Sequence, residues 1–113
     1  MSTAAIRRHW NRVAALGCII CGGEAEIAHC HGGSLLDRGI LHAKGKKLAR
    51  YDWLVLPLAP RFHRAEYGGL DADVRAWEKR YGTQAEHLDA VGRRLRLDLW
   101  ALAGETQSYE RAV

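Results

Sequence analysis

The chain has 113 residues, with 17 Lys and Arg against 13 Asp and Glu and a net charge of +4. This length suits one small domain with a modest core, and four tryptophans help to fill that core. No stretch approaches the roughly 20 apolar residues of a membrane span, and the opening MSTAAIRRHW lacks the apolar run of a secretory signal. We therefore expect a cytoplasmic protein with no membrane partner. Its basic balance suits a nucleic acid or simply a solvated surface.

The first predicted element is an N-terminal helix. Ile6, Trp10 and Val13 recur at helical spacing, and Gly17 is placed to end the helix. Residues 18–29 follow, and their composition around the sequence CGGE predicts two short strands joined by a turn.

The middle of the chain is predicted to be a loop followed by a strand. Residues 31–52 are basic and contain several glycines, which is typical of a long functional loop. The apolar run at 53–58 has strand length. Pro60 then suits the first turn of a helix, because its missing N–H has no partner there.

The C-terminal half is predicted to be helical. Asp71 is expected to cap a helix that Gly82 ends, and a last helix is expected over residues 84–103. Residues 105–113 show no periodicity and are expected to form a tail. The whole pattern predicts an α+β protein with a single domain over residues 1–104.

All three cysteines fall within a short N-terminal stretch. Cys18 and Cys21 have the two-residue spacing of half a zinc site, and tetrahedral zinc needs two further ligands. Cys30, His31 or His42 can supply them. The alternative is that Cys18 and Cys21 are a pair of buried thiols that act as small core residues.

Strand alternation separates the next group of residues. It sends His29 and His31 to one face of a strand, and Ala28 and Cys30 to the other. Cys30 can then join the other cysteines, while the histidines face a different site.

A third group surrounds the apolar run at 53–58. Asp52 precedes this run, and His63 lies in the first turns of the helix predicted after it. Glu66 is three residues further on, so His63 and Glu66 can share a helical face and a metal ion.

In this order and spacing, these motifs resemble the HNH endonuclease superfamily, whose core is the ββα-metal (His-Me finger) fold. The likeness is closest to phage-borne recombination-enhancement nucleases. It covers about residues 15–82, and it implies a core of about residues 17–68, flanked here by an N-terminal helix and additional C-terminal helices. The pieces that carry it are Cys18 and Cys21, Ala28-His29, the lysines of 44–47, Asp52, and the stretch from Pro57 to His63.

The resemblance implies a role for each motif residue. His29 matches the general base that takes a proton from the attacking water, and His63 matches a ligand of a catalytic Mg²⁺ or Mn²⁺ ion. Asp52 and Glu66 are candidates to complete the site. The residues expected to bind DNA are Lys44, Lys46, Lys47, Arg50, Arg61 and Arg64.

The chain departs from the family pattern at three positions. Ala59 and Phe62 stand where the family has zinc ligands, and Tyr67 replaces a further histidine. These departures allow three outcomes. Other residues supply the missing zinc ligands, or the zinc is lost and apolar packing takes its place, or the whole site is degenerate. Because both replacements are apolar, they favour apolar packing without zinc.

The sequence therefore predicts a metal-dependent DNA endonuclease of HNH type, acting in phage or prophage DNA metabolism or recombination within a bacterial cell. Its expected partners are DNA, a second copy of the chain, and phage or host recombination proteins. The first alternative is an inactive HNH-fold module that binds nucleic acid or protein. The second is a zinc-knuckle regulator built on Cys18, Cys21, Cys30 and a histidine.

Overall fold

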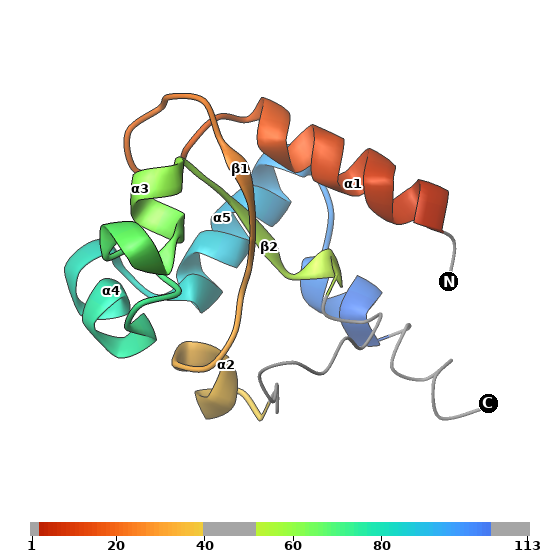
Figure 1. Cartoon of the computed structure of the whole chain (residues 1–113). Helices are drawn as coiled ribbons and strands as arrows, with labels where there is room; N and C mark the ends of the chain where they lie inside the picture. The colour runs from red at the N-terminus through yellow and green to blue at the C-terminus, as the bar shows by residue number, and fades with distance from the viewer. Residues whose placement is uncertain (1–2, 40–51, 105–113) are drawn as a thin grey trace.

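Two antiparallel strands cross the centre of the molecule, and helices pack around them (Figure 1). Strand β1 (Glu26–His29) pairs with β2 (Val55–Leu58), in a register that sets Ala28 opposite Leu56. The structure, a computed structural model, describes residues 3–39 and 52–104.

Helices come before, between and after the two strands along the chain. In Figure 1, α1 runs across the top of the view, α5 passes behind the strands, and α3 and α4 lie to their left. No described helix is long and apolar enough to cross a membrane. The helical elements are α1 (Thr3–Ala15), α2 (Ser34–Asp37), α3 (Pro60–His63), the 3₁₀ helix η2 (Ala65–Tyr67), α4 (Val74–Tyr81), α5 (Gln84–Leu95) and a segment at 99–104. The predicted α+β class is confirmed.

The strand pair forms part of the hydrophobic core. All four residues of β2 are buried, since α1 and α5 both pack against this strand. On β1, Ala28 and the following Cys30 are fully buried, whereas His29 and His31 keep partial contact with solvent. The predicted alternation of this stretch is confirmed, and it leaves the two imidazoles at the surface.

The predicted N-terminal helix is confirmed as α1, but the hairpin predicted within residues 18–29 is wrong. Of these residues only 26–29 form a strand, and its partner is β2. The preceding residues close a tight loop, in which the Cys18 N–H donates to the Gly23 carbonyl and the Gly22 N–H donates to the Cys18 carbonyl. These backbone groups are therefore already paired within the loop.

The loop predicted over residues 31–52 is only partly described. It contains α2, while residues 40–51 lie outside the described part of the chain, as does the tail predicted at 105–113. The strand predicted within 53–58 and the helix start at Pro60 are both confirmed.

The predicted N-cap at Asp71 is wrong. Helix α4 begins at Val74, and Asp73 caps it by accepting a hydrogen bond from the Ala76 N–H at 3.0 Å. Asp71 therefore lies outside the helix, and its carboxylate is available for other partners. Gly82 ends α4 as predicted.

The single helix predicted over residues 84–103 is also wrong. Helix α5 stops at Leu95 because Arg96 adopts the left-handed conformation, with φ of 57°. The Leu97 N–H bonds back to the Gly92 carbonyl at 2.9 Å, and Asp98 accepts from the Ala101 N–H at 3.0 Å to start the next segment. The chain therefore turns after Leu95, although the apolar residues over 84–103 follow the spacing of one continuous helix.

The segment after η2 packs very closely against α3. The Leu70 N–H donates to the Phe62 carbonyl at 2.9 Å, and the Asp71 N–H donates to the His63 carbonyl at 3.0 Å. A Cβ atom at Gly69 would lie 2.6 Å from backbone atoms of Phe62 and His63. Only glycine allows this approach, which brings Asp71 alongside His63.

Gly69→Ala is expected to lower the free energy of unfolding by about 1–3 kcal/mol, because the added methyl group overpacks against backbone that cannot yield. Urea denaturation measures the change. Gly104→Ala is the control, since a Cβ there meets no atom within 4 Å. Equal stability of the two variants would contradict the close approach.

Candidate functional site

His29 and Asp52 form the first imidazole–carboxylate pair of the candidate site. His29 Nε2 lies 3.2 Å from Asp52 Oδ1, and the His29 side chain is 42% exposed. Trp10 of α1 holds both partners: its ring meets the His29 ring edge-on at 5.5 Å, and its Nε1–H donates to the Asp52 carbonyl at 2.8 Å. This pair joins the end of β1 to the residues just before β2.

His63, at the end of α3, forms a second centre. Its Nδ1 lies 2.5 Å from Glu26 Oε2, and its Nε2 lies 3.2 Å from Asp71 Oδ2. Arg64 clamps the same Glu26 carboxylate through Nε and Nη2, at 3.0 and 2.8 Å. A carboxylate on one ring nitrogen fixes the orientation of an imidazole and the tautomer it presents on the other.

Asp71 links this centre to His31. Its Oδ1 lies 2.9 Å from His31 Nε2, while its Oδ2 faces His63. The sequence interpretation missed Asp71, because it assigned that side chain to a helix cap. It also missed Glu26, for which the sequence offers no signal, because strand alternation places it on the Ala28 face and not with His29.

The structure does not assemble the predicted ligand set of Asp52, His63 and Glu66. Asp52 pairs with His29. Glu66 is 64% exposed and lies 4.0 Å from Arg64. Within the described residues, the carboxylates within ion-pair distance of His63 are Glu26 and Asp71.

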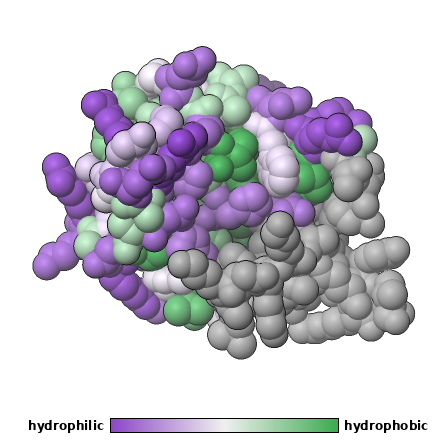
Figure 2. Space-filling model, viewed as in Figure 1, coloured by the Kyte–Doolittle hydropathy of each residue, from purple (hydrophilic) through white to green (hydrophobic). Residues whose placement is uncertain are grey.

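The predicted DNA-binding residues are divided by the structure. Arg64 is engaged by Glu26, whereas Arg61 is exposed and stacks over the Phe62 ring at 4.8 Å. Figure 2 shows hydrophilic side chains over most of the coloured surface in this view, with hydrophobic ones in small separate patches. The predicted residues that lie outside the described part are Lys44, Lys46, Lys47 and Arg50.

The cysteines Cys18 and Cys21 lie together in the tight loop before β1. Cys18 is buried and accepts a 3.4 Å hydrogen bond from the Ile20 N–H, whereas Cys21 is exposed. The Gly23 N–H, the Cys18 thiol and the Arg61 guanidinium lower the pKa of Cys21. A guanidinium therefore supplies positive charge beside this pair.

Cys30 has a different environment. It is fully buried, and burial together with the charges of Glu78 and Asp71 raises its pKa well above the usual thiol value. Ala59 and Phe62, which replace the family's zinc ligands, pack against the hydrophobic core. Phe62 also meets Tyr81 edge-on at 5.5 Å.

The donor chemistry of the site limits what ion it can hold. Across residues 3–39 and 52–104, no three His, Cys, Asp or Glu side chains are grouped so that they could hold a metal ion. His63 Nε2 and Asp71 Oδ2 do form a two-donor arrangement, with Glu26 behind the imidazole. Two protein ligands that include a carboxylate are enough for Mg²⁺ or Mn²⁺, which retain several waters, but not for a tetrahedral zinc.

The described residues define a small α+β protein built around one two-stranded sheet. A profile for the family described as "Protein of unknown function (DUF968)" matches residues 3–95, and the chain belongs to this family. No curated protein and no solved structure matches the chain.

Replacing Glu26 is expected to change how stability depends on pH. Arg64 and then His63 hold the pKa of Glu26 below its usual 4.5, against the opposing effect of burial. Since the folded-state pKa is the lower one, this stabilisation is complete above pH 4.5 and is lost as pH falls through the folded-state pKa.

The free energy of unfolding of Glu26→Gln should therefore fall less steeply than that of the wild type in the acid range. Urea denaturation at several pH values measures it, with the exposed Glu24→Gln as control. If Glu26→Gln and Glu24→Gln show the same slope, the Glu26 cluster does not form.

Iodoacetamide is expected to modify Cys21 first at neutral pH, because its lowered pKa leaves more thiolate than an ordinary cysteine has. Cys30 should react only after unfolding. Mass spectrometry of a time course measures both rates, and Arg61→Gln should slow the Cys21 reaction. Protection of Cys21 that a chelator removes would instead indicate a bound metal ion.

Proposed function

We propose that this protein is a metal-dependent endonuclease with a ββα-metal core formed by β1, β2 and α3. The observation that carries the proposal is the placement of two carboxylate-bound imidazoles on one unit of two paired strands and a helix. His29 ends β1, and His63 ends the helix that follows β2. The family resemblance assigns these two positions to the base and to the metal ligand.

His29 is suited to the role of general base. A carboxylate at 3.2 Å from Nε2 favours the tautomer with the proton on that nitrogen, which leaves the Nδ1 lone pair to accept a proton from water. Asp52 then acts as a positioning residue, because it orients the ring without touching the substrate. The 42% exposure of the His29 side chain leaves room for water and a phosphate to approach.

His63 and Asp71 are the residues proposed to hold the divalent ion. With Glu26 accepting the Nδ1–H of His63, the Nε2 lone pair points toward the Asp71 carboxylate. A bound Mg²⁺ or Mn²⁺ ion supplies positive charge for the phosphate oxygens and for the leaving oxygen. This assignment replaces Asp52 and Glu66 as ligands.

Arg61 is the described basic residue best suited to a neighbouring DNA phosphate. It is exposed on α3, two residues before His63, whereas Arg64 is held by Glu26. A guanidinium binds phosphate oxygens through two parallel hydrogen bonds. Binding that depends on such contacts weakens as salt concentration rises.

One observation favours the second candidate, an inactive HNH-fold module that binds nucleic acid. Among residues 3–39 and 52–104, no group of three ligands is formed, so an ion held by these residues depends on two side chains and water. A module of this kind retains DNA in a salt-sensitive way but does not cut it.

The test is cleavage of supercoiled plasmid with Mg²⁺ or Mn²⁺. The wild type should cut the plasmid, and His29→Ala should be slower by about 10²–10⁴-fold, the usual contribution of a general base. His63→Ala and Asp71→Asn should also lose activity, because each removes one of the two proposed ligands. The rate of plasmid linearisation or nicking is the measurement.

Glu66→Gln is the matched control, since this exposed carboxylate contacts Arg64 and lies outside both centres. It should cleave at the wild-type rate. Loss of activity in Glu66→Gln with retention in Asp71→Asn would restore the sequence-based ligand assignment. Salt-sensitive DNA retention without cleavage by any divalent ion would establish the inactive module.

A further inference from the structure

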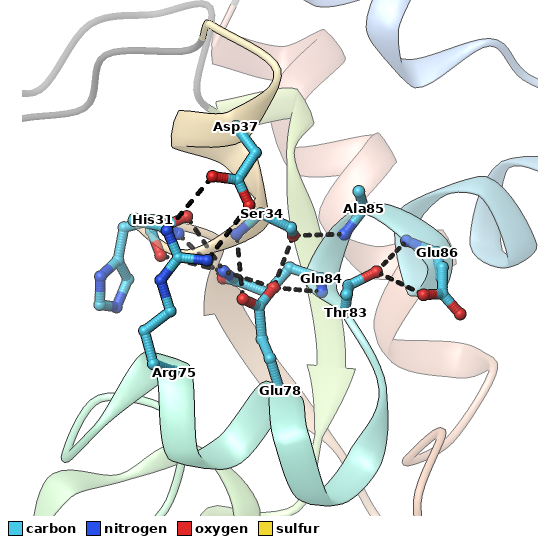
Figure 3. A network of polar contacts seen from close by, with 10 residues as sticks. His31, Ser34, Asp37, Arg75, Glu78, Thr83, Gln84, Ala85 and Glu86 are labelled. Atoms are coloured by element: carbon cyan, nitrogen blue, oxygen red, sulfur yellow. Dashed lines mark hydrogen bonds and ion pairs between the residues drawn. The ribbon is translucent and has the colours of Figure 1, made fainter.

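A buried carboxylate joins α2, α4 and α5 close to the proposed metal site. Glu78 of α4 is only 7% exposed, and both of its oxygens are used (Figure 3). Oε1 accepts from the Ser34 N–H at 2.9 Å, and Oε2 accepts from the Ser34 hydroxyl at 2.5 Å and the Gln84 N–H at 2.7 Å. A buried charge is tolerated only when donors satisfy it in this way.

The first turns of two helices are tied together by this carboxylate. Ser34 and Gln84 are the first residues of α2 and α5, so their N–H groups have no acceptor within their own helices. The Ser34 hydroxyl also accepts from the Ala85 N–H at 3.1 Å. Gly33 allows the approach, because a Cβ there would lie 2.2 Å from Glu78 Oε1.

Gln84 connects this hydrogen-bonded cluster to His31. The Gln84 side chain is fully buried, and its Oε1 accepts from the His31 N–H at 3.0 Å. Its Nε2 donates to the His31 carbonyl, also at 3.0 Å, and lies 3.4 Å from Glu78 Oε2. One buried amide therefore holds both backbone groups of His31, as Figure 3 shows.

His31 in turn faces the proposed ion ligand Asp71. Its Nε2 lies 2.9 Å from Asp71 Oδ1, on the opposite oxygen from the one that faces His63. The arrangement parallels that of Glu26 behind His63. A metal-binding carboxylate depends on its outer hydrogen-bond partner for orientation, just as a metal-binding imidazole does.

We infer that His31 is a positioning residue for the carboxylate of Asp71, and that Gln84, anchored by Glu78, fixes His31 for this task. The inference rests on the proposed function, because it assigns the outer partners of the same site. It gives Asp71 a defined orientation without a third protein ligand. It also gives a role to a histidine that the sequence motif leaves without one.

The test is the affinity of the purified protein for Mn²⁺, measured by isothermal titration calorimetry without DNA. His31→Ala should weaken Mn²⁺ binding by about 10–100-fold, the usual effect of losing an outer partner. Gln84→Met keeps the side-chain volume but removes both hydrogen bonds to His31, so it should weaken binding by about tenfold. In the His31→Ala background, Gln84→Met should have no further effect.

Thr83→Ala separates positioning from general destabilisation. Thr83 caps α5, the helix that Gln84 begins, by accepting a hydrogen bond from the Glu86 N–H at 3.1 Å, and it makes this contact at the surface. The variant should lose thermal stability and still bind Mn²⁺ like the wild type. If Gln84→Met fails to fold, the partly exposed His31 still supports the test through His31→Ala.

Three results would overturn the inference: no Mn²⁺ binding by the wild type, unchanged affinity in His31→Ala, or additive effects of the two substitutions. Failure of the proposed function has a separate signature. Mn²⁺ binding that follows the expected pattern, with plasmid left intact, would refute the nuclease and retain the positioning role. If the wild type and His31→Ala bind Mn²⁺ with equal affinity and both cleave the plasmid, the nuclease is retained and the positioning role of His31 is refuted.

Discussion

The close packing of residues 69–71 against α3 is the constraint on which the candidate site depends. Gly69 allows the backbone of this segment to hydrogen-bond along α3, and a Cβ there would collide at 2.6 Å. The register of these bonds brings Asp71 next to His63 and turns its other oxygen toward His31. Without this approach the two imidazoles would share no carboxylate.

In the rest of the candidate site, His29, His31 and His63 each lie within ion-pair distance of a carboxylate from another segment of the chain. Asp52 serves His29, Glu26 serves His63, and Asp71 serves His31 and His63. The buried Glu78 works differently, because backbone and hydroxyl donors fill its oxygens. It stabilises the starts of α2 and α5, while the partly exposed carboxylates orient the imidazoles.

Some predictions succeeded because they depended on neighbours in sequence. Alternation along β1, the start of α3 at Pro60 and the apolar strand β2 are all local properties. Residues 18–29 were misassigned because β1 takes its partner from beyond a long connection. The break after α5 was missed because Arg96 adopts the left-handed conformation, and no glycine or proline marks the position. Asp71 was missed because Asp73, two residues later, has the same capping chemistry.

The sequence by itself determined where the motif histidines sit on their own elements. It placed His29 on a strand and His63 in the first turns of a helix, and strand alternation separated His29 and His31 from Cys30. Only the tertiary structure decided which carboxylate each imidazole receives. Glu26 lies 37 residues from His63 in the chain, and Asp71 lies 40 residues from His31. A hydrogen bond over such a separation depends on how closely packed elements approach, and no local pattern encodes that distance.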